Sequence, residues 1–485
     1  MTDTAKTGLA ALEARVRRDL ACLNLPAPNW VPERQVGGET VLDVAIAGGG
    51  MCGLLAHFAL AAHGIRNTRV LDRNPAGAEG PWVTYARMET LRSPKTLPGP
   101  AFGMGPLTFR AWFEAQFGAA EWEALDKIPR TMWMDYLRWY RRVLDIPVEN
   151  GVEVVRAEPE GDLLRLHLRG AETDSVLARR FIMATGRDGT GGPNIPAFVN
   201  ALPRSAWAHS ADPIDFAALR GKRVVVVGIG ASAVDNAAEA LEHGAAEVRH
   251  LIRRTEMPRI NKLTGVGSPG FTHGYRELDD AARWRIMHYA MTTQTPAPRG
   301  STLRVSRHPN AFFHFGAGVT GCRMDGDEIV VSTPKGPLRT DFLILGTGFR
   351  IEAQARPELD GYADRIALWR DRYAAPVGLE HPELGNFPYL APDFSFVEKL
   401  PGTAPWLRLI HCFNYGATLS MGKVSGDIPG ISTGARWLAS GLAAAFYKED
   451  ADIHWQRLMA YETPELEGDE WTASPLPVEH ARDVA

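Results

Sequence analysis

Two glycine-rich segments of the same type constrain the fold of this chain more than any other feature. The first is Gly48–Gly53, which follows the apolar run Val41–Ala47, and the second is Gly228–Ala233, which follows Arg223–Val227. In such a segment the first glycine makes a tight turn, the second lets the backbone approach a pyrophosphate, and the small third residue lets helix and strand pack closely. The phosphates then meet backbone N–H groups at the positive end of the helix. The pattern predicts two dinucleotide-binding units and electron transfer between their ligands.

The residue at the end of the next strand distinguishes the two sites. Asp72 lies about 20 residues beyond the first segment, where an acid accepts hydrogen bonds from a ribose hydroxyl. Arg253 and Arg254 stand at the equivalent distance beyond the second segment, and a guanidinium matches a 2′-phosphate. We therefore expect FAD at the first site and NADPH, in preference to NADH, at the second. The alternative for the two arginines is a solvated strand end.

Length and charge limit the class of protein. A chain of 485 residues exceeds one hydrophobic core, which predicts two or three domains. The formal net charge of −4 gives no reason to expect nucleic acid or a membrane surface as partner. The sequence has no apolar run of about 20 residues and no signal-like start, which predicts a cytoplasmic enzyme.

The cysteines argue against one kind of two-dinucleotide enzyme. Disulfide reductases need two closely spaced redox thiols, whereas the four cysteines here are far apart in the sequence. They are Cys22, Cys52, Cys322 and Cys412. We expect Cys52, inside the first glycine segment, to be a small packing residue. Neither cysteines nor histidines show the spacing of metal ligands, so no metal site is expected.

The predicted fold is α/β, with two Rossmann-like dinucleotide-binding domains, the second inserted in the first. A helical extension at 1–40 precedes the first part of the FAD domain at 41–210. The NADPH domain is expected at 211–344, with an insertion at about 259–318, and the FAD domain is completed, with a C-terminal tail, at 345–485. The insertion is interpreted either as domain packing or as the source of substrate contacts.

The order of short motifs along the chain resembles that of the class B flavoprotein monooxygenases. Besides the two glycine segments, the chain has a G-x-W at Gly80–Trp82, an A-T-G at Ala184–Gly186 and a G-T-G-F at Gly346–Phe349. The resemblance covers about 41–445. It implies that NADPH reduces FAD, that a C4a-(hydro)peroxyflavin forms with O2, and that one oxygen atom is inserted into a small-molecule substrate.

Other segments bear on the subgroup. Thr90–Pro94 resembles the T-L-R-D-P segment of ornithine N-hydroxylases, and Asp135–Trp139 resembles their D-Y-L-x-W helix. Trp207–Pro213 keeps the His209 of the linker motif of Baeyer–Villiger enzymes but lacks its glycine and trailing aromatic. N-hydroxylation of an amine or amino-acid-like molecule is therefore preferred. The alternatives are Baeyer–Villiger or sulfur oxidation, an NADPH-dependent flavin oxidoreductase or oxidase without oxygen insertion, and a non-catalytic flavin-binding sensor.

The resemblance also implies roles for single residues. Arg92 and Lys95 are expected to be catalytic by stabilising a peroxide anion, and the helix predicted over Thr433–Tyr447 is expected to face the flavin with its N-terminus. The expected FAD contacts are Gly48, Gly50, Met51, Cys52, Gly53, Asp72, Arg73, Trp82, Val154, Thr185, Gly186 and Thr433, and Arg92 is expected to contact FAD or NADP. The expected NADPH contacts are Gly228, Gly230, Ala231, Ser232, Ala233, Arg253, Arg254, Thr347 and Gly348. A homo-oligomer is left open.

Overall fold

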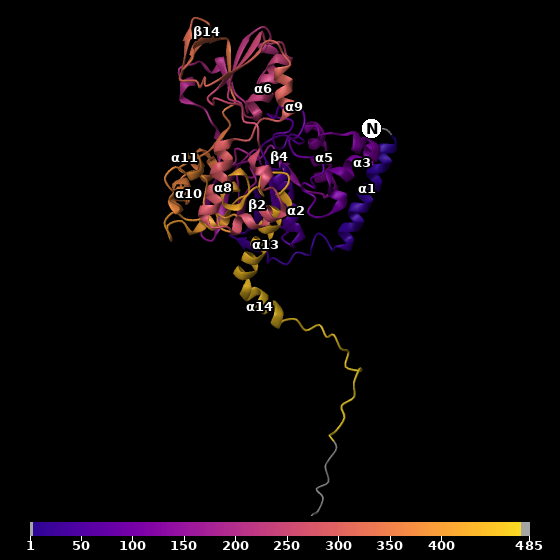
Figure 1. Ribbon diagram of the computed structural model, residues 1–485. Helices are drawn as coiled ribbons and strands as arrows, with labels where there is room; N and C mark the ends of the chain where they lie inside the picture. Colours follow the sequence, from indigo (N-terminus) through magenta and orange to yellow (C-terminus); the bar gives the residue numbers. More distant parts are fainter. Residues whose placement is uncertain (1–2, 477–485) are drawn as a thin grey trace, which may run out of the picture.

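The computed structural model describes residues 3–476 and contains two sheets built on the two glycine segments (Figure 1). The first sheet has the order β4-β3-β2-β7-β6-β5, with β1 beside β2 and β18 beside β7. Its strands are β1 (Arg34–Val36), β2 (Glu39–Ala47), β3 (Thr68–Asp72), β4 (Val148–Asn150), β5 (Glu153–Glu160), β6 (Leu163–Arg169), β7 (Ser175–Met183) and β18 (Ile410–Cys412). The strands that carry the glycine turn and its neighbours, from β4 through β7 and β18, are parallel.

The second sheet is entirely parallel, in the order β12-β11-β10-β16-β9. Its strands are β9 (Trp207–His209), β10 (Arg223–Val227), β11 (Glu247–Ile252), β12 (Ala311–Phe315) and β16 (Phe342–Leu345). Three antiparallel strands, β13 (Gly321–Asp325), β14 (Glu328–Thr333) and β15 (Gly336–Thr340), precede its last crossover. Strands β8 (Gly191–Pro193) and β17 (Phe349–Ile351) pair with each other where the chain passes between the two domains.

Helices cover both sheets. Those of the first domain are α1 (Asp3–Cys22), α2 (Met51–Ala62), α3 (Phe109–Phe117), α4 (Ala119–Ala124), α5 (Arg130–Val143), α12 (Thr418–Met421), α13 (Ile431–Glu449) and α14 (Ala451–Met459). The others are α6 (Ala231–Glu242), α7 (Pro269–Gly274), α8 (Asp280–Thr293), α9 (Arg299–Ser306), α10 (Trp369–Arg372) and α11 (Pro382–Gly385). Helices α2 and α6 directly follow the two glycine turns. No helix within residues 3–476 is long and apolar enough to cross a membrane.

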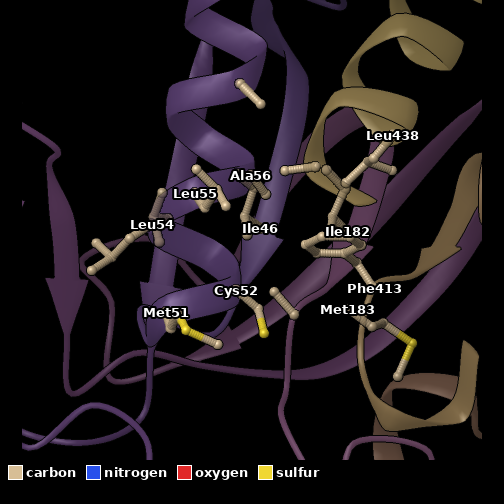
Figure 2. Close-up of a cluster of buried hydrophobic side chains, with 14 of the residues drawn as sticks. Ile46, Met51, Cys52, Leu54, Leu55, Ala56, Ile182, Met183, Phe413 and Leu438 are labelled. Carbon is tan, nitrogen blue, oxygen red and sulfur yellow. The ribbon is translucent and has the colours of Figure 1, made fainter. Parts of the chain in front are cut away.

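Close packing of helix against strand explains the small residues of both segments. A Cβ on Gly53 would lie 1.7 Å from the carbonyl oxygen of Gly48, so α2 can approach its turn only without a side chain there. In the second domain a Cβ on Gly346 would lie 2.3 Å from that of Ala233. Figure 2 shows α2 in one apolar cluster with both neighbouring strands and with Leu438 of α13.

The segment expected as an insertion has two structural roles. Helix α8 packs in an apolar cluster with residues from 351 to 419, as the packing interpretation requires. Strand β12, however, is the edge strand of the second sheet and pairs in parallel with β11. Helix α9 therefore belongs to the crossover that connects these two strands. The structure therefore differs from the expected insertion at 259–318, whose last part belongs to the Rossmann core. The apolar run in β12 resembled an inserted element because nothing in its sequence shows which strand it pairs with.

A buried ion-pair network joins the first sheet to the end of α13. The side chain of Asp450 has no exposed surface and bridges Arg179 of β7, at 2.8 Å, and Arg34 of β1, at 2.7 Å. Asp43 of β2 is buried beside this network. Burial raises the pKa of Asp43 to about 7, and the charge of Arg179 opposes this shift.

The buried Asp43 predicts a specific pH dependence of stability. The carboxyl titrates at about 3.9 in an unfolded chain, so between about pH 4 and pH 7 the native state binds more protons and stability falls as pH rises. We expect Asp43→Asn to raise the melting temperature at pH 8 and to have little effect at pH 4.5. Thermal unfolding at several pH values measures this, with Asp327→Asn, an exposed position between β13 and β14, as matched control. A melting-temperature difference that does not change with pH would contradict the assignment.

Candidate functional site

A cavity of about 300 Å³ lies where β2, β3 and β7 end and α2 begins. The expected FAD contacts that line it are Gly48, Gly50, Met51, Cys52, Asp72, Arg73, Trp82, Val154, Thr185 and Gly186. Gly53 lies behind them, against the turn. A second, more open cavity of about 400 Å³ shares Gly50 and continues toward α5. The first glycine segment thus lies between two hollows, and Gly50 lines both of them.

The glycine turn leaves its open side toward the cavity. Gly48 has a φ of +106°, and a Cβ there would lie 2.4 Å from the carbonyl oxygen of Ala184. Gly50 has an ordinary φ of −75°, and the nearest atom to a Cβ there is Gly80 Cα at 3.7 Å. The turn therefore needs glycine at 48 for its conformation, whereas glycine at 50 keeps space free in front of the helix N-terminus. Such space suits the pyrophosphate of a dinucleotide.

Asp72 holds this turn from the end of β3. Its carboxylate accepts hydrogen bonds from the backbone N–H of Gly49 at 2.7 Å and of Asn74 at 2.8 Å. Burial raises the pKa of Asp72, and these two hydrogen bonds oppose that shift. A carboxylate has about four acceptor positions, so it retains capacity for a ribose hydroxyl. The loop contact is an additional role that the spacing in the sequence did not indicate.

The second glycine turn has the same geometry. Gly228 has a φ of +108°, and a Cβ there would lie 2.8 Å from the carbonyl oxygen of Gly346, whereas Gly230 has a φ of −70°. The nearest atom to a Cβ on Gly230 is the flexible end of Gln294, at 3.9 Å. Ser232 is exposed on the first turn of α6. This turn is therefore also open to a ligand.

The two arginines after β11 differ in their surroundings. Arg253 is exposed, whereas Arg254 donates hydrogen bonds to Gln294 Oε1 and to the carbonyl oxygen of Thr292, both at 2.7 Å. Gln294 also lies beside Gly230, so Arg254 is linked to the glycine turn through it. Their binding of a 2′-phosphate stays a prediction, for which Arg253 has the freer side chain.

The expected catalytic pair does not line the 300 Å³ cavity. Arg92 donates to the carbonyl oxygen of Pro296 at 2.5 Å; burial lowers its pKa, and the charge of Asp235 opposes this shift. Lys95 donates to the carbonyl oxygens of Trp122 and Glu123, at 2.5 and 3.2 Å. Arg92 therefore bridges the two domains, and the amine of Lys95 is held by the C-terminal end of α4. The catalytic roles of both stay predictions.

The remaining expected contacts are divided between cavity and junction. Thr433 lies in the first turn of α13, and the cavity is lined by Gly426 and Asp427 of the loop before it. Thr347 and Gly348 hydrogen-bond to the backbone of Asn194, which places them at the connection between domains. They do not line the 300 Å³ cavity.

Several lining residues were missed at the level of sequence. They include Tyr85, Arg187, Asp188 and Tyr415. The guanidinium of Arg187 lies 3.8 Å above the ring of Tyr415. The position of Arg187 directly after the A-T-G motif was a usable signal, whereas Tyr415 comes from a distant part of the chain with no recognisable pattern.

The cysteines and the other potential metal ligands are the subject of two further expectations. All four cysteines are free, and burial raises the pKa of Cys52 to about 12, so this lining thiol stays protonated. Within residues 3–476 no group of three or more His, Cys, Asp or Glu side chains could hold a metal ion.

The chain has close counterparts among known proteins. The family model described as pyridine nucleotide-disulphide oxidoreductase matches residues 45–266. A protein of Xanthomonas campestris pv. campestris, the FAD-dependent urate hydroxylase, is 40% identical over 463 residues, which cover 95% of this chain and 98% of the relative. This chain belongs to the class B flavoprotein monooxygenases. Its resemblance to them and the predicted two-domain α/β fold are confirmed.

Solved structures of monooxygenases share this fold. The ornithine N-hydroxylase of Kutzneria sp. 744 matches with a TM-score of 0.63 at 17% identity, over 84% of this chain and 99% of that one. The ornithine hydroxylase of Pseudomonas aeruginosa matches with a TM-score of 0.62 at 17% identity, over 83% and 99%. These structures show the fold, and the 40% identity to an FAD-dependent hydroxylase shows that this monooxygenase is an FAD-dependent enzyme, as expected.

The two open glycine turns predict that FAD binding and reduction by NADPH can be lost separately. Gly50→Ala should fold, because its φ is ordinary and its Cβ has space, yet the protein should lose FAD because the methyl group fills the pyrophosphate path. Gly230→Ala should keep FAD and lose rapid reduction by NADPH. Flavin absorbance after desalting and stopped-flow reduction measure these effects, with Gly105→Ala, an exposed glycine with nothing within 4 Å, as control. Full FAD retention by Gly50→Ala would contradict this placement of the cofactor.

Proposed function

We propose that this monooxygenase uses FAD and NADPH to hydroxylate urate or a closely related oxopurine. The observation that carries the proposal is the 40% identity, over nearly the full length of both chains, to an FAD-dependent urate hydroxylase. The lining of the cavity supports it. Urate is a planar weak acid, and the Arg187–Tyr415 pair offers a cation beside an aromatic ring, which suits a flat anion.

The residues that hold the cofactors follow from the geometry of the two turns. FAD would lie in the 300 Å³ cavity, with its pyrophosphate at Gly48–Gly50 and its adenosine ribose near Asp72. NADPH would lie on Gly228–Gly230, with its 2′-phosphate at Arg253. When bound and reduced by NADPH, the flavin activates O2, one atom of which enters the substrate while the other leaves as water.

The chain supplies orientation and charge for this chemistry. Gly426 and Asp427, in the loop before α13, line the cavity, and the backbone N–H groups at the N-terminus of α13 would favour negative charge on the flavin. Trp82 lines the same cavity and would exclude water from it. A cytoplasmic location stays a prediction from the sequence.

N-hydroxylation of an amine or amino acid is the second candidate. The fold shared with ornithine N-hydroxylases favours it, as do the motifs at Thr90–Pro94 and Asp135–Trp139. In the structure, however, Tyr136 and Trp139 are buried in the core, and the hydroxyl of Tyr136 donates to the carbonyl oxygen of Leu107. This helix motif therefore serves packing, which weakens its value as a sign of substrate.

Substrate-stimulated turnover distinguishes these candidates. We expect urate to accelerate NADPH oxidation and, under ¹⁸O2, to yield a product carrying one labelled oxygen atom by mass spectrometry. Ornithine, lysine and cadaverine should neither accelerate the reaction nor become labelled. Stimulation by an amine alone would establish N-hydroxylation instead. NADPH oxidation with stoichiometric H2O2 and no labelled product would indicate an oxidase.

Arg253 should determine the choice of nicotinamide cofactor. Loss of a charge-assisted hydrogen bond worth roughly 1.5–3 kcal/mol predicts about a ten- to hundredfold rise in KM for NADPH in Arg253→Ala. The KM for NADH should hardly change, because NADH has no 2′-phosphate. Steady-state kinetics with both cofactors test this, and Arg323→Ala, an exposed arginine on β13, is the control. An equal rise for both cofactors would assign Arg253 to the fold or the diphosphate.

Arg92 should affect coupling rather than flavin binding. Arg92→Ala removes the hydrogen bond to Pro296 that joins the flavin-side loop to the second domain. We expect normal FAD content and a larger fraction of NADPH electrons recovered as H2O2. The exposed Arg110→Ala is the control. Unchanged coupling would remove Arg92 from the mechanism.

A further inference from the structure

The described part of the chain ends in an arm, residues 451–476, that leads away from the body (Figure 1). It consists of α14 followed by a segment without regular structure. No residue of α14 is buried, and all residues from Trp455 to Leu476 are exposed. The arm therefore makes few contacts with the chain that carries it.

The base of the arm is nevertheless firmly attached. The rings of Tyr447 and His454 stack with centroids 4.4 Å apart, and Trp30 lies against both. Arg457 donates to the carbonyl oxygen of Trp30 at 2.8 Å. The residue that joins α13 to α14 is Asp450, the centre of the buried ion-pair network. These contacts fix the direction of α14, so the same side of this helix is held towards solvent.

The side of α14 that faces solvent carries several large apolar side chains. Trp455, Leu458 and Met459 recur at the i, i+3, i+4 spacing of one helix face. The exposed fractions of these side chains are 56% for Trp455, 67% for Leu458 and 53% for Met459, and Tyr461, just after the helix, is 70% exposed. A contiguous apolar patch of this kind on a surface marks an interaction site.

The segment after α14 is acidic, which restricts the partner. Between 458 and 476 the chain has no lysine or arginine. Its acidic residues are Glu462, Glu465, Glu467, Asp469 and Glu470. A partner surface must therefore combine an apolar area with positive charge, and an anionic membrane is disfavoured.

The same chain has a complementary basic surface on α1 and α5. These helices lie on one side of the molecule and are joined by the ion pair of Arg142 with Glu13 at 3.1 Å (Figure 1). The exposed arginines of this surface, called here the arginine face, are Arg15, Arg17, Arg18, Arg138 and Arg142. Arg15, Arg138 and Arg142 each pair with an acid of the same two helices, whereas Arg17 and Arg18 form no ion pair within residues 3–476. The acidic segment of the arm carries the charge opposite to that of this face, so two copies of the chain offer each other complementary surfaces.

We propose that the arm binds a second copy of this chain. The apolar sides of the two α14 helices pack on each other, and each acidic segment lies along the arginine face of its partner. Such an arrangement is two-fold symmetric and self-complementary. The segment after α14 can span about 50 Å when extended, and residues 451–476 fall within the roughly 20–30 residues a side of a standard interface.

Arm variants test whether the arm causes dimerisation. Sedimentation equilibrium of the FAD-loaded protein should give about twice the 53.1 kDa mass of the chain. Trp455→Ser with Leu458→Ser, and a chain ending at Ala460, should each raise the dimer dissociation constant at least tenfold. FAD content should not change, since these side chains are exposed. Val377→Ser, which replaces a 97% exposed apolar residue elsewhere, is the control and should remain dimeric.

A charge exchange tests the proposed position of the acidic segment. Arg17→Glu with Arg18→Glu should weaken the dimer, as should Glu465→Arg with Glu467→Arg, and all four together should restore it. High salt should weaken the wild-type dimer. A monomeric wild-type chain at 50 μM would overturn the proposal and leave the arm to a different protein. A dimer that survives loss of the arm, or a failure of the combined charge exchange, would also overturn it.

Discussion

The two sites depend on backbone approaching backbone where a strand ends and a helix begins. In the first domain the contact is Gly53 against the carbonyl oxygen of Gly48, and in the second it is Ala233 against Gly346. One added methyl group at Gly53 would overlap an oxygen atom, so the constraint is steric and leaves no room for repacking. This contact places the N-terminus of each helix at the edge of its sheet where the parallel strands end. The first backbone N–H groups of the helix have no partner within the helix and are available there to a ligand. The ligand sites follow from this placement.

Two arginine side chains at the junction connect the FAD-side domain to the second domain. Arg304 of α9 donates to Glu239 and Glu242 of α6, and also to the carbonyl oxygen of Arg87 in the first domain. Arg92, which comes from the first domain, donates a hydrogen bond in the opposite direction, to the carbonyl oxygen of Pro296. The loop that follows Trp82 is thus linked through Arg304 of α9 to α6, the helix that follows the second glycine turn. Through this single arginine, a movement of α6 would reach the loop that begins beside Trp82 of the 300 Å³ cavity.

Local patterns were predictable from the sequence, and pairings between distant segments were not. The glycine turns and the acid at Asp72 are set by steric rules that act over a few residues, so their spacing alone indicated a dinucleotide site. Lys95 shows the opposite case. Its neighbours in sequence match a family motif, but its amine is taken by two carbonyl oxygens of α4, about 27 residues away along the chain. The hydrogen-bond partner of a long side chain depends on tertiary structure that no motif records.

The fold is shared with enzymes that reduce disulfides, and a few lining residues separate the two chemistries. The matched family model is named for disulphide oxidoreductases, yet the one cysteine in the cavity, Cys52, is buried and its pKa is raised to about 12. A thiol with so high a pKa is a poor nucleophile, and no second cysteine lines this cavity to form a disulfide with it. Electrons that reach a flavin here have no thiol acceptor in the cavity. Instead, the cavity is lined by the aromatic rings of Trp82 and Tyr85 and by the cation of Arg187, a combination that suits a small planar molecule.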